Sequence, residues 1–172
     1  DPAQIEDADV YIVTVPTPVD TSNNPDLGAV ISASKVVGSY MKKNAIVVFE
    51  STVYPGVTET ICGPALERAS GMISGTDFYL GYSPERINPG DKLHTVDKIT
   101  KVVAGQTPEV AVFLLELYGK LTNGNVFQAK DIKTAEAAKV IENAQRDINI
   151  AFVNEMAMIF SQMGIQTQDV LE

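Results

Sequence analysis

Residues 8–15, Ala-Asp-Val-Tyr-Ile-Val-Thr-Val, form an almost continuous run of apolar and β-branched residues. The lack of polar alternation is typical of a strand in a parallel sheet whose two faces are covered by helices. Runs of the same kind follow at residues 45–49, 78–82, 99–104 and 126–129. Helical patterns separate some of these runs, at residues 28–41, 58–69 and 108–120. Because strands and helices alternate, the sequence predicts an open, mostly parallel α/β sheet with right-handed crossovers.

The stretch at residues 131–163 decides the rest of the fold, because these 33 residues include neither proline nor glycine. At 1.5 Å per residue they would form a helix roughly 50 Å long, which exceeds what a crossover requires. Apolar side chains lie around much of its circumference, so we expect more than one face to be buried. Helices of this kind commonly link two domains or two subunits. Gly164 ends the predicted helix, and residues 167–172 resemble the opening turn of another.

The composition excludes several classes of function. Thirteen basic and 22 acidic side chains give a net charge of −9, which disfavours nucleic acid as a partner. No apolar run approaches the roughly 20 residues needed to cross a bilayer, and the first residues do not resemble a signal peptide, so we expect a cytoplasmic protein without a membrane partner. Cys62 is the single cysteine and His94 the single histidine. An internal disulfide is therefore excluded, and no metal site is expected.

Three polar or turn-rich segments follow three successive predicted strands, at residues 16–18, 50–56 and 83–90. Open α/β sheets bind ligands beyond the carboxyl ends of their strands, so the three segments together indicate a shared cleft. The alternative is that each segment is ordinary loop surface, since strand-end loops are polar in most soluble proteins.

Lys139 and Asn143 lie four residues apart in the long predicted helix and therefore on one face of it. A lysine and an amide directed at one point can stabilise a developing oxyanion. The alternative, which the spacing alone favours, is that Lys139 pairs with Glu136 or Glu142 on a solvated face.

Four motifs in collinear order cover nearly the whole chain and resemble the nucleotide-sugar 6-dehydrogenases. They are Ala-Asp-Val-Tyr-Ile-Val-Thr-Val-Pro-Thr-Pro, Glu-Ser-Thr-Val-Tyr-Pro-Gly, Ser-Pro-Glu-Arg-Ile-Asn-Pro-Gly-Asp, and Ala-Lys-Val-Ile-Glu-Asn with Val-Asn-Glu beyond it. The third motif is most similar to that of the UDP-N-acetylhexosamine branch, especially the UDP-N-acetylglucosamine and UDP-N-acetylgalactosamine enzymes. Pro89 stands where the glucose branch has a second glutamate. A UDP-glucose or UDP-N-acetylmannosamine enzyme is the alternative within the family.

The resemblance implies a fold and a reaction. Residues 1–129 would be the second half of a Rossmann-like NAD-binding domain, and residues 130–172 the start of a central helical domain. The family oxidises the C6 hydroxyl of a UDP-sugar twice with two NAD, through an aldehyde and a cysteine thioester, to a uronic acid. A homodimer through the helix at residues 131–163 is the expected assembly.

The resemblance also implies the roles of individual residues. Thr52 would help to position the catalytic water, and Glu85 would be the general base that activates this water against the thioester. Lys139 would act as base in the alcohol step and, with Asn143, stabilise the oxyanions. Glu85, Lys139 and Asn143 would also contact the substrate.

Further residues would bind the sugar and the cofactor. Arg86 and Ile87 match the loop whose backbone holds the sugar, and Thr17 and Thr52 match positions that line the NAD site. Pro89 removes a carboxylate that the glucose branch places near the cofactor, so that contact does not transfer to this chain.

Two parts of the family's machinery do not occur in this sequence. It contains no Gly-x-Gly-x-x-Gly turn for the pyrophosphate, and it lacks the glycine-rich motif of the nucleophilic cysteine. Cys62 is expected to be a small core residue of a helix and His94 a loop residue. The chain by itself is therefore expected to be inactive. An alternative of another class is a folded scaffold whose long helix drives self-association.

Overall fold

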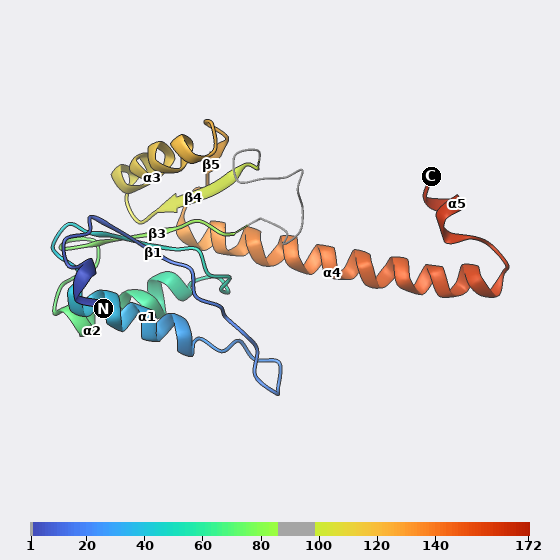
Figure 1. Cartoon of the computed structure of the whole chain (residues 1–172), viewed down its shortest axis with the longest axis horizontal. Helices are drawn as coiled ribbons and strands as arrows, with labels where there is room; N and C mark the ends of the chain where they lie inside the picture. The colour runs from blue at the N-terminus through green and yellow to red at the C-terminus, as the bar shows by residue number, and fades with distance from the viewer. Residues whose placement is uncertain (1, 86–98) are drawn as a thin grey trace. The chain divides into compact units, whose positions relative to one another are not determined.

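The computed structural model describes residues 2–85 and 99–172. The chain divides into two compact units, Asp1–Ala138 and Lys139–Glu172, and each is described by itself. The first unit contains one sheet of five strands in the order β1-β2-β3-β4-β5 (Figure 1). The strands are β1 (Val10–Val13), β2 (Ile46–Phe49), β3 (Tyr79–Tyr82), β4 (Lys101–Gly105) and β5 (Val126–Gln128). Every predicted strand is therefore present, with bounds that differ by one or two residues.

The sheet is mostly parallel, as predicted, with one reversal. β1, β2 and β3 are parallel to one another, so that Val13 lies opposite Phe49 and Phe49 opposite Tyr82. β4 is antiparallel to β3 and parallel to β5. The right-handed crossovers expected of the parallel strands do not apply between β3 and β4. An antiparallel neighbour needs no crossover helix, whereas a parallel one does.

Helices cover both faces of the sheet (Figure 1). α1 (Gly28–Tyr40) and α2 (Gly63–Ser70) pack against each other on one face, and α3 (Pro108–Leu121) covers β4 and β5 on the other. A π-helical turn, Thr58–Cys62, precedes α2 within the single helix that the sequence predicted. α3 begins where expected, with the Thr107 side chain accepting a hydrogen bond from the Val110 N–H and Pro108 in the first turn.

Two apolar clusters hold this unit together, one on each side of the sheet. The larger lies beneath α1 and α2 and includes Val47, Phe49, Leu66, Leu80 and Tyr82. The smaller lies beneath α3 and includes Val48, Val103, Leu114 and Tyr118. The central strands therefore bury side chains on both faces, which accounts for their unbroken apolar sequences.

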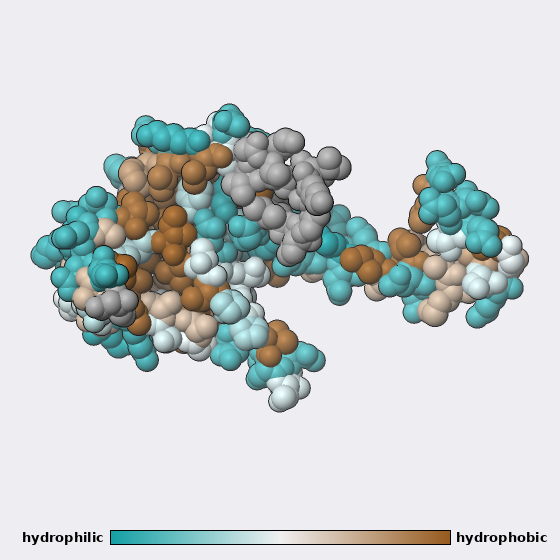
Figure 2. Space-filling model, in the orientation of Figure 1, coloured by the Kyte–Doolittle hydropathy of each residue, from teal (hydrophilic) through white to brown (hydrophobic). Residues whose placement is uncertain are grey.

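The long helix α4 (Ile132–Gln162) begins in the first unit and continues through the second, followed by α5 (Thr167–Leu171). The sequence predicted that more than one of its faces is buried, and this is wrong within the single chain. Apolar side chains remain exposed on the second unit (Figure 2), among them Ile141, Ile148, Phe152, Met158 and Met163. A helix buries its circumference only against neighbouring elements, and the second unit offers only α5.

In residues 2–85 and 99–172, we find no helix with the length and apolar character that a bilayer-spanning segment requires.

Candidate functional site

The loops that follow β1 and β2 are tied together at the carboxyl edge of the sheet. The two strands are parallel and in register, so their ends emerge side by side. The Thr17 hydroxyl donates a hydrogen bond to the Thr52 carbonyl, and the Ser51 hydroxyl donates to the Val15 carbonyl at 2.6 Å. Two of the expected site residues, Thr17 and Thr52, are thus brought into direct contact. Thr52 is exposed and Thr17 partly buried, so the pair is accessible from solvent.

The end of β3 joins the same edge. The Tyr82 hydroxyl donates to the Ser51 carbonyl at 3.3 Å, which fixes the loop after β2 against β3. Burial raises the pKa of Tyr82 above its ordinary value, so the hydroxyl stays protonated and remains a donor. The Ser83 hydroxyl donates to the Val102 carbonyl at 2.8 Å and so links β3 to β4. These bonds position the short segment that carries Glu85.

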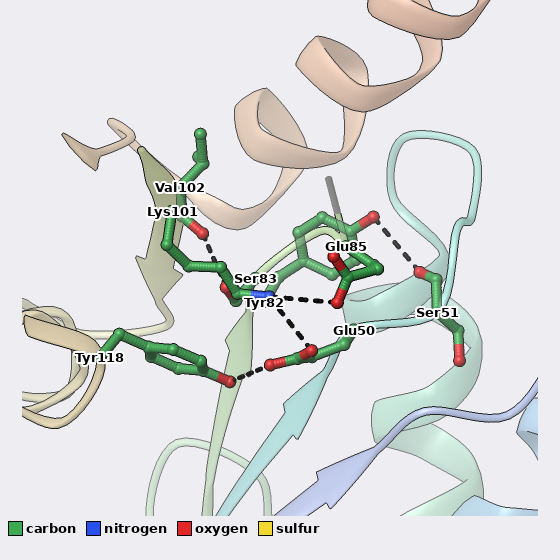
Figure 3. Close-up of polar contacts among 8 residues, drawn as sticks. All are labelled: Glu50, Ser51, Tyr82, Ser83, Glu85, Lys101, Val102 and Tyr118. Carbon is green, nitrogen blue, oxygen red and sulfur yellow. Dashed lines mark hydrogen bonds and ion pairs between the residues drawn. The ribbon is translucent and has the colours of Figure 1, made fainter. Parts of the chain in front are cut away.

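Glu85 lies next to a cluster of charged and polar side chains (Figure 3). The Lys101 ammonium lies 3.1 Å from a Glu50 carboxylate oxygen and 3.9 Å from a Glu85 oxygen. The second Glu50 oxygen accepts a hydrogen bond from the Tyr118 hydroxyl. The exposed fractions of the side chains are 6% for Lys101, 13% for Glu50 and 48% for Glu85. The cluster is therefore buried except on the side of Glu85.

Burial controls the protonation of Tyr118 in this cluster. It raises the pKa of Tyr118, and the hydrogen bond to Glu50 raises that pKa further, so the phenol remains a donor. The Lys101 ammonium also lies 5.5 Å from the centre of the Tyr118 ring, within the range of a cation–π contact. A buried charge without a partner is costly, and these contacts compensate both Lys101 and Glu50.

Neither Lys101 nor Tyr118 is among the predicted site residues. A signal was nevertheless available, because Lys101 is a charged residue within a run predicted to be a covered strand. Lysine is almost never fully buried without a partner, so its presence there indicates a buried carboxylate nearby. The partner Glu50 is 51 residues away along the chain, and only the folded sheet brings the two together.

Glu136 holds the other end of the loop after β2. It is fully buried, and its carboxylate accepts hydrogen bonds from the backbone N–H groups of Gly56 and Thr58, the latter at 2.9 Å. These N–H groups lie at the start of the helical segment that leads into α2 and would otherwise lack partners. A carboxylate is also favoured at a helix N-terminus by the helix dipole. The segment that carries Thr52 is therefore anchored at both ends.

The remaining predicted site residues belong to the second unit or lie outside the described residues. Lys139 and Asn143 belong to the second unit, on α4, whereas Thr17, Thr52 and Glu85 belong to the first. Of the two acidic partners considered for Lys139, Glu136 accepts the two backbone bonds described above, and Glu142 forms an ion pair with Arg146 at 3.2 Å. Arg86 and Ile87 lie outside the described residues, as do Pro89 and His94.

The part of the chain that the structure describes fits one wall of an NAD site. Thr17 and Thr52 place a hydroxyl and peptide groups at the carboxyl ends of neighbouring parallel strands, where nucleotides bind in such sheets. The pyrophosphate cradle would have to come from a glycine-rich turn that this sequence lacks. For residues 2–85 and 99–172, no cluster of three or more His, Cys, Asp or Glu side chains could hold a metal ion.

Cys62 is a core residue, as predicted. Its side chain is completely buried. Burial raises the pKa of the Cys62 thiol to about 11, although the Ser34 hydroxyl acts in the opposite direction. A thiol with this pKa is protonated near neutral pH and is a poor nucleophile. Cys62 is therefore unsuited to form a thioester.

Comparisons with known proteins agree with this architecture. Residues 2–122 match the model of the UDP-glucose/GDP-mannose dehydrogenase family, NAD binding domain, and residues 133–172 match that family's central domain. Protein CapL of Staphylococcus aureus is 54% identical over 168 residues, or 98% of this chain. A UDP-N-acetyl-D-glucosamine 6-dehydrogenase of Pseudomonas aeruginosa is 53% identical over the same share. The chain spans about 40% of the length of both relatives.

A solved structure from the same family has the same fold as this chain. The UDP-D-ManNAc dehydrogenase from Pyrococcus horikoshii has a TM-score of 0.90 and 32% identity, covering 99% of this chain and 40% of that one. Together with the family match, this confirms the predicted Rossmann-like, mostly parallel sheet followed by a long helix.

Proposed function

Because this chain belongs to the UDP-glucose/GDP-mannose dehydrogenase family, we propose that it is part of an NAD-dependent enzyme that oxidises C6 of a UDP-N-acetylhexosamine. The identity of 53% to a UDP-N-acetyl-D-glucosamine 6-dehydrogenase supports this substrate class. Relatives named for UDP-N-acetyl-D-mannosamine share 33%. Residues 1–129 would belong to the NAD-binding domain and residues 130–172 to the central domain, in a cytoplasmic enzyme.

The proposed reaction converts a primary alcohol to a carboxylate. Two hydrides leave C6, one to each of two NAD, and water supplies the second oxygen, so that one alcohol yields one carboxylate, two NADH and three protons. NAD supplies only the hydride acceptor. The thioester requires a reactive thiol, and buried Cys62 does not provide one. That thiol would come from a part of the full-length protein beyond these 172 residues.

One observation carries the assignment of the site. Three parallel strand ends meet at one edge, where the Thr17 hydroxyl is bonded to the Thr52 carbonyl and Glu85 follows the neighbouring strand. In the proposed function, Thr17 and Thr52 line the cofactor site, and Thr52 also helps to hold the water. Glu85 takes the proton from that water, a role that requires an accessible carboxylate. Its exposed fraction of 48% is consistent with this role.

The other predicted residues complete the proposed site. Lys139 acts as base for the alcohol and, with Asn143, stabilises the oxyanion at C6, which requires donors aimed at the point where charge develops. Arg86 and Ile87 hold the sugar through their backbone. The chain by itself is expected to be inactive, because it lacks the glycine turn and a reactive cysteine.

The test is a full-length protein that carries this sequence, assayed with NAD and each UDP-sugar separately. The proposal predicts the highest kcat/KM with a UDP-N-acetylhexosamine and release of the uronic acid. Preferred turnover of UDP-glucose would contradict the proposed substrate class. The variant E85Q should accumulate the thioester, and unchanged steady-state turnover of this variant would refute the role of Glu85.

Self-association is a second candidate function, and the exposed apolar side chains of α4 favour it. Phe152 and Ile148 are 63% and 66% exposed in the single chain. Surfaces of this kind commonly mark an interface. We propose a homodimer through the helix at residues 131–163, to be measured by sedimentation equilibrium. A strictly monomeric mass at high concentration would contradict it.

A further inference from the structure

The charged cluster beside Glu85 has no part in the function proposed so far. Glu50, Lys101 and Tyr118 come from the end of β2, from β4 and from α3. Buried ion pairs add little net stability, because the loss of water from both charges offsets their attraction. Stability alone therefore gives no reason for this cluster at the carboxyl edge of the sheet.

The geometry of the cluster fixes the Lys101 ammonium. Both oxygens of Glu50 are engaged, one by the Tyr118 hydroxyl and the other by Lys101 at 3.1 Å. Glu50 is thus held from both sides and restrains the ammonium. An ammonium has three N–H donors, and Glu50 takes one of them. On the open side of the cluster lies the Glu85 carboxylate, 3.9 Å from the same nitrogen (Figure 3).

We propose that Lys101 is a positioning residue that orients the Glu85 carboxylate toward the catalytic water, and that Glu50 and Tyr118 hold Lys101 in place for this purpose. This inference rests on the proposed role of Glu85 as general base. A fixed cation beside a flexible, half-exposed carboxylate limits the orientations of that carboxylate.

The step that Lys101 serves is the hydrolysis of the thioester. The water oxygen forms a bond to the acyl carbon while one water proton moves to Glu85. The bond between the acyl carbon and sulfur then breaks, and its electron pair leaves on the sulfur as thiolate. Neither hydride transfer uses Glu85 as a base. Loss of Lys101 should therefore slow hydrolysis and leave both oxidations intact.

The first experiment uses K101M in the full-length enzyme with NAD and a saturating UDP-sugar. Rapid mixing should show an NADH burst of normal rate, up to two per active site, before hydrolysis limits turnover. The steady-state kcat should fall roughly 10- to 100-fold, part of the about 10²–10⁴-fold that a general base contributes. KM for the sugar should change little.

Three further variants make the result specific. K101R keeps the positive charge and should retain most of kcat. Y118F removes only the hydroxyl bonded to Glu50 and should lower kcat less than K101M does. If K101M does not fold, Y118F is the variant that tests the inference. K43M removes a lysine that pairs with Asp77 at 3.0 Å on the surface and should behave as the unmodified enzyme.

The ratio of the burst rate to the steady-state kcat separates positioning from general damage. Lys101 contacts Glu85, which serves hydrolysis but neither hydride transfer. This ratio should therefore rise in K101M and return to the value of the unmodified enzyme in K101R. A variant with only structural damage would lose both rates together.

Two results would overturn the inference. If K101M matches the unmodified enzyme in burst rate and steady-state kcat while E85Q stalls at the thioester, Lys101 does not position Glu85, and the proposed function stands. If K101M slows burst and steady state equally, its role is structural. An unchanged kcat in E85Q would instead refute the role of Glu85 and this inference with it.

Discussion

The variant E136Q tests how the loop that carries Thr52 is held. The Glu136 carboxylate is fully buried and accepts bonds from the Gly56 and Thr58 N–H groups. Glutamine has nearly the same shape, but it removes the charge and turns an NH₂ donor toward one of these donors. Hydrogen bonds to charged groups contribute about 1.5–3 kcal/mol each, and the facing donors add a desolvation cost. We expect the free energy of unfolding to fall by about 2–4 kcal/mol.

The assay is urea unfolding of the 172-residue chain followed by circular dichroism. Hydrogen exchange at the Gly56 and Thr58 amides should accelerate in the same variant. The matched control is E116Q, at an exposed position of α3, which should change stability by less than about 0.5 kcal/mol. If E136Q unfolds within about 0.5 kcal/mol of the unmodified chain, or exchange at these amides is unchanged, the anchoring role is refuted.

Three further predictions concern packing, the thiol and assembly. G38A should lower the free energy of unfolding by about 1–3 kcal/mol, because the added Cβ would lie 2.9 Å from the Leu66 carbonyl oxygen. G119A lies in open space on α3 and should raise the free energy of unfolding slightly in the same urea assay. Burial raises the pKa of Cys62 from 9.0 to about 11, so the thiol should resist thiol reagents at pH 8, and rapid labelling of the folded chain would contradict this. The free energy of unfolding should fall as the pH rises from 9 toward 11, because the thiol of the unfolded chain ionises first. F152D, at an exposed position of α4, should weaken self-association in sedimentation experiments without changing the helix content of the chain by circular dichroism.

Local pattern was sufficient to predict the elements of the fold. The predicted helix at residues 28–41 is observed as Gly28–Tyr40, and the one predicted at residues 108–120 is observed as Pro108–Leu121. The direction of β4 was not predicted, because the residues of a buried strand are similar whether its neighbour is parallel or antiparallel. The π-helical turn at Thr58–Cys62 was also missed, since its residues continue the pattern of the following helix.

The site was predicted only where it follows from strand order. The contact between Thr17 and Thr52 follows from two neighbouring parallel strands that end together. The cluster of Glu50, Lys101 and Tyr118 was not predicted. Lys101 is 51 residues and Tyr118 is 68 residues from Glu50 along the chain, and only the folded sheet brings them together. Glu136 was considered as a partner of Lys139, and its contact with the loop after β2 depends on tertiary packing.

The most direct test of the proposed function is the stoichiometry of the full-length enzyme with UDP-N-acetylglucosamine and excess NAD. NADH is followed by absorbance, and the sugar product is identified by mass spectrometry. We expect two NADH for each sugar consumed and a single uronic acid product. One NADH per sugar with an aldehyde as final product, or no turnover of this substrate alongside turnover of UDP-glucose, would contradict it.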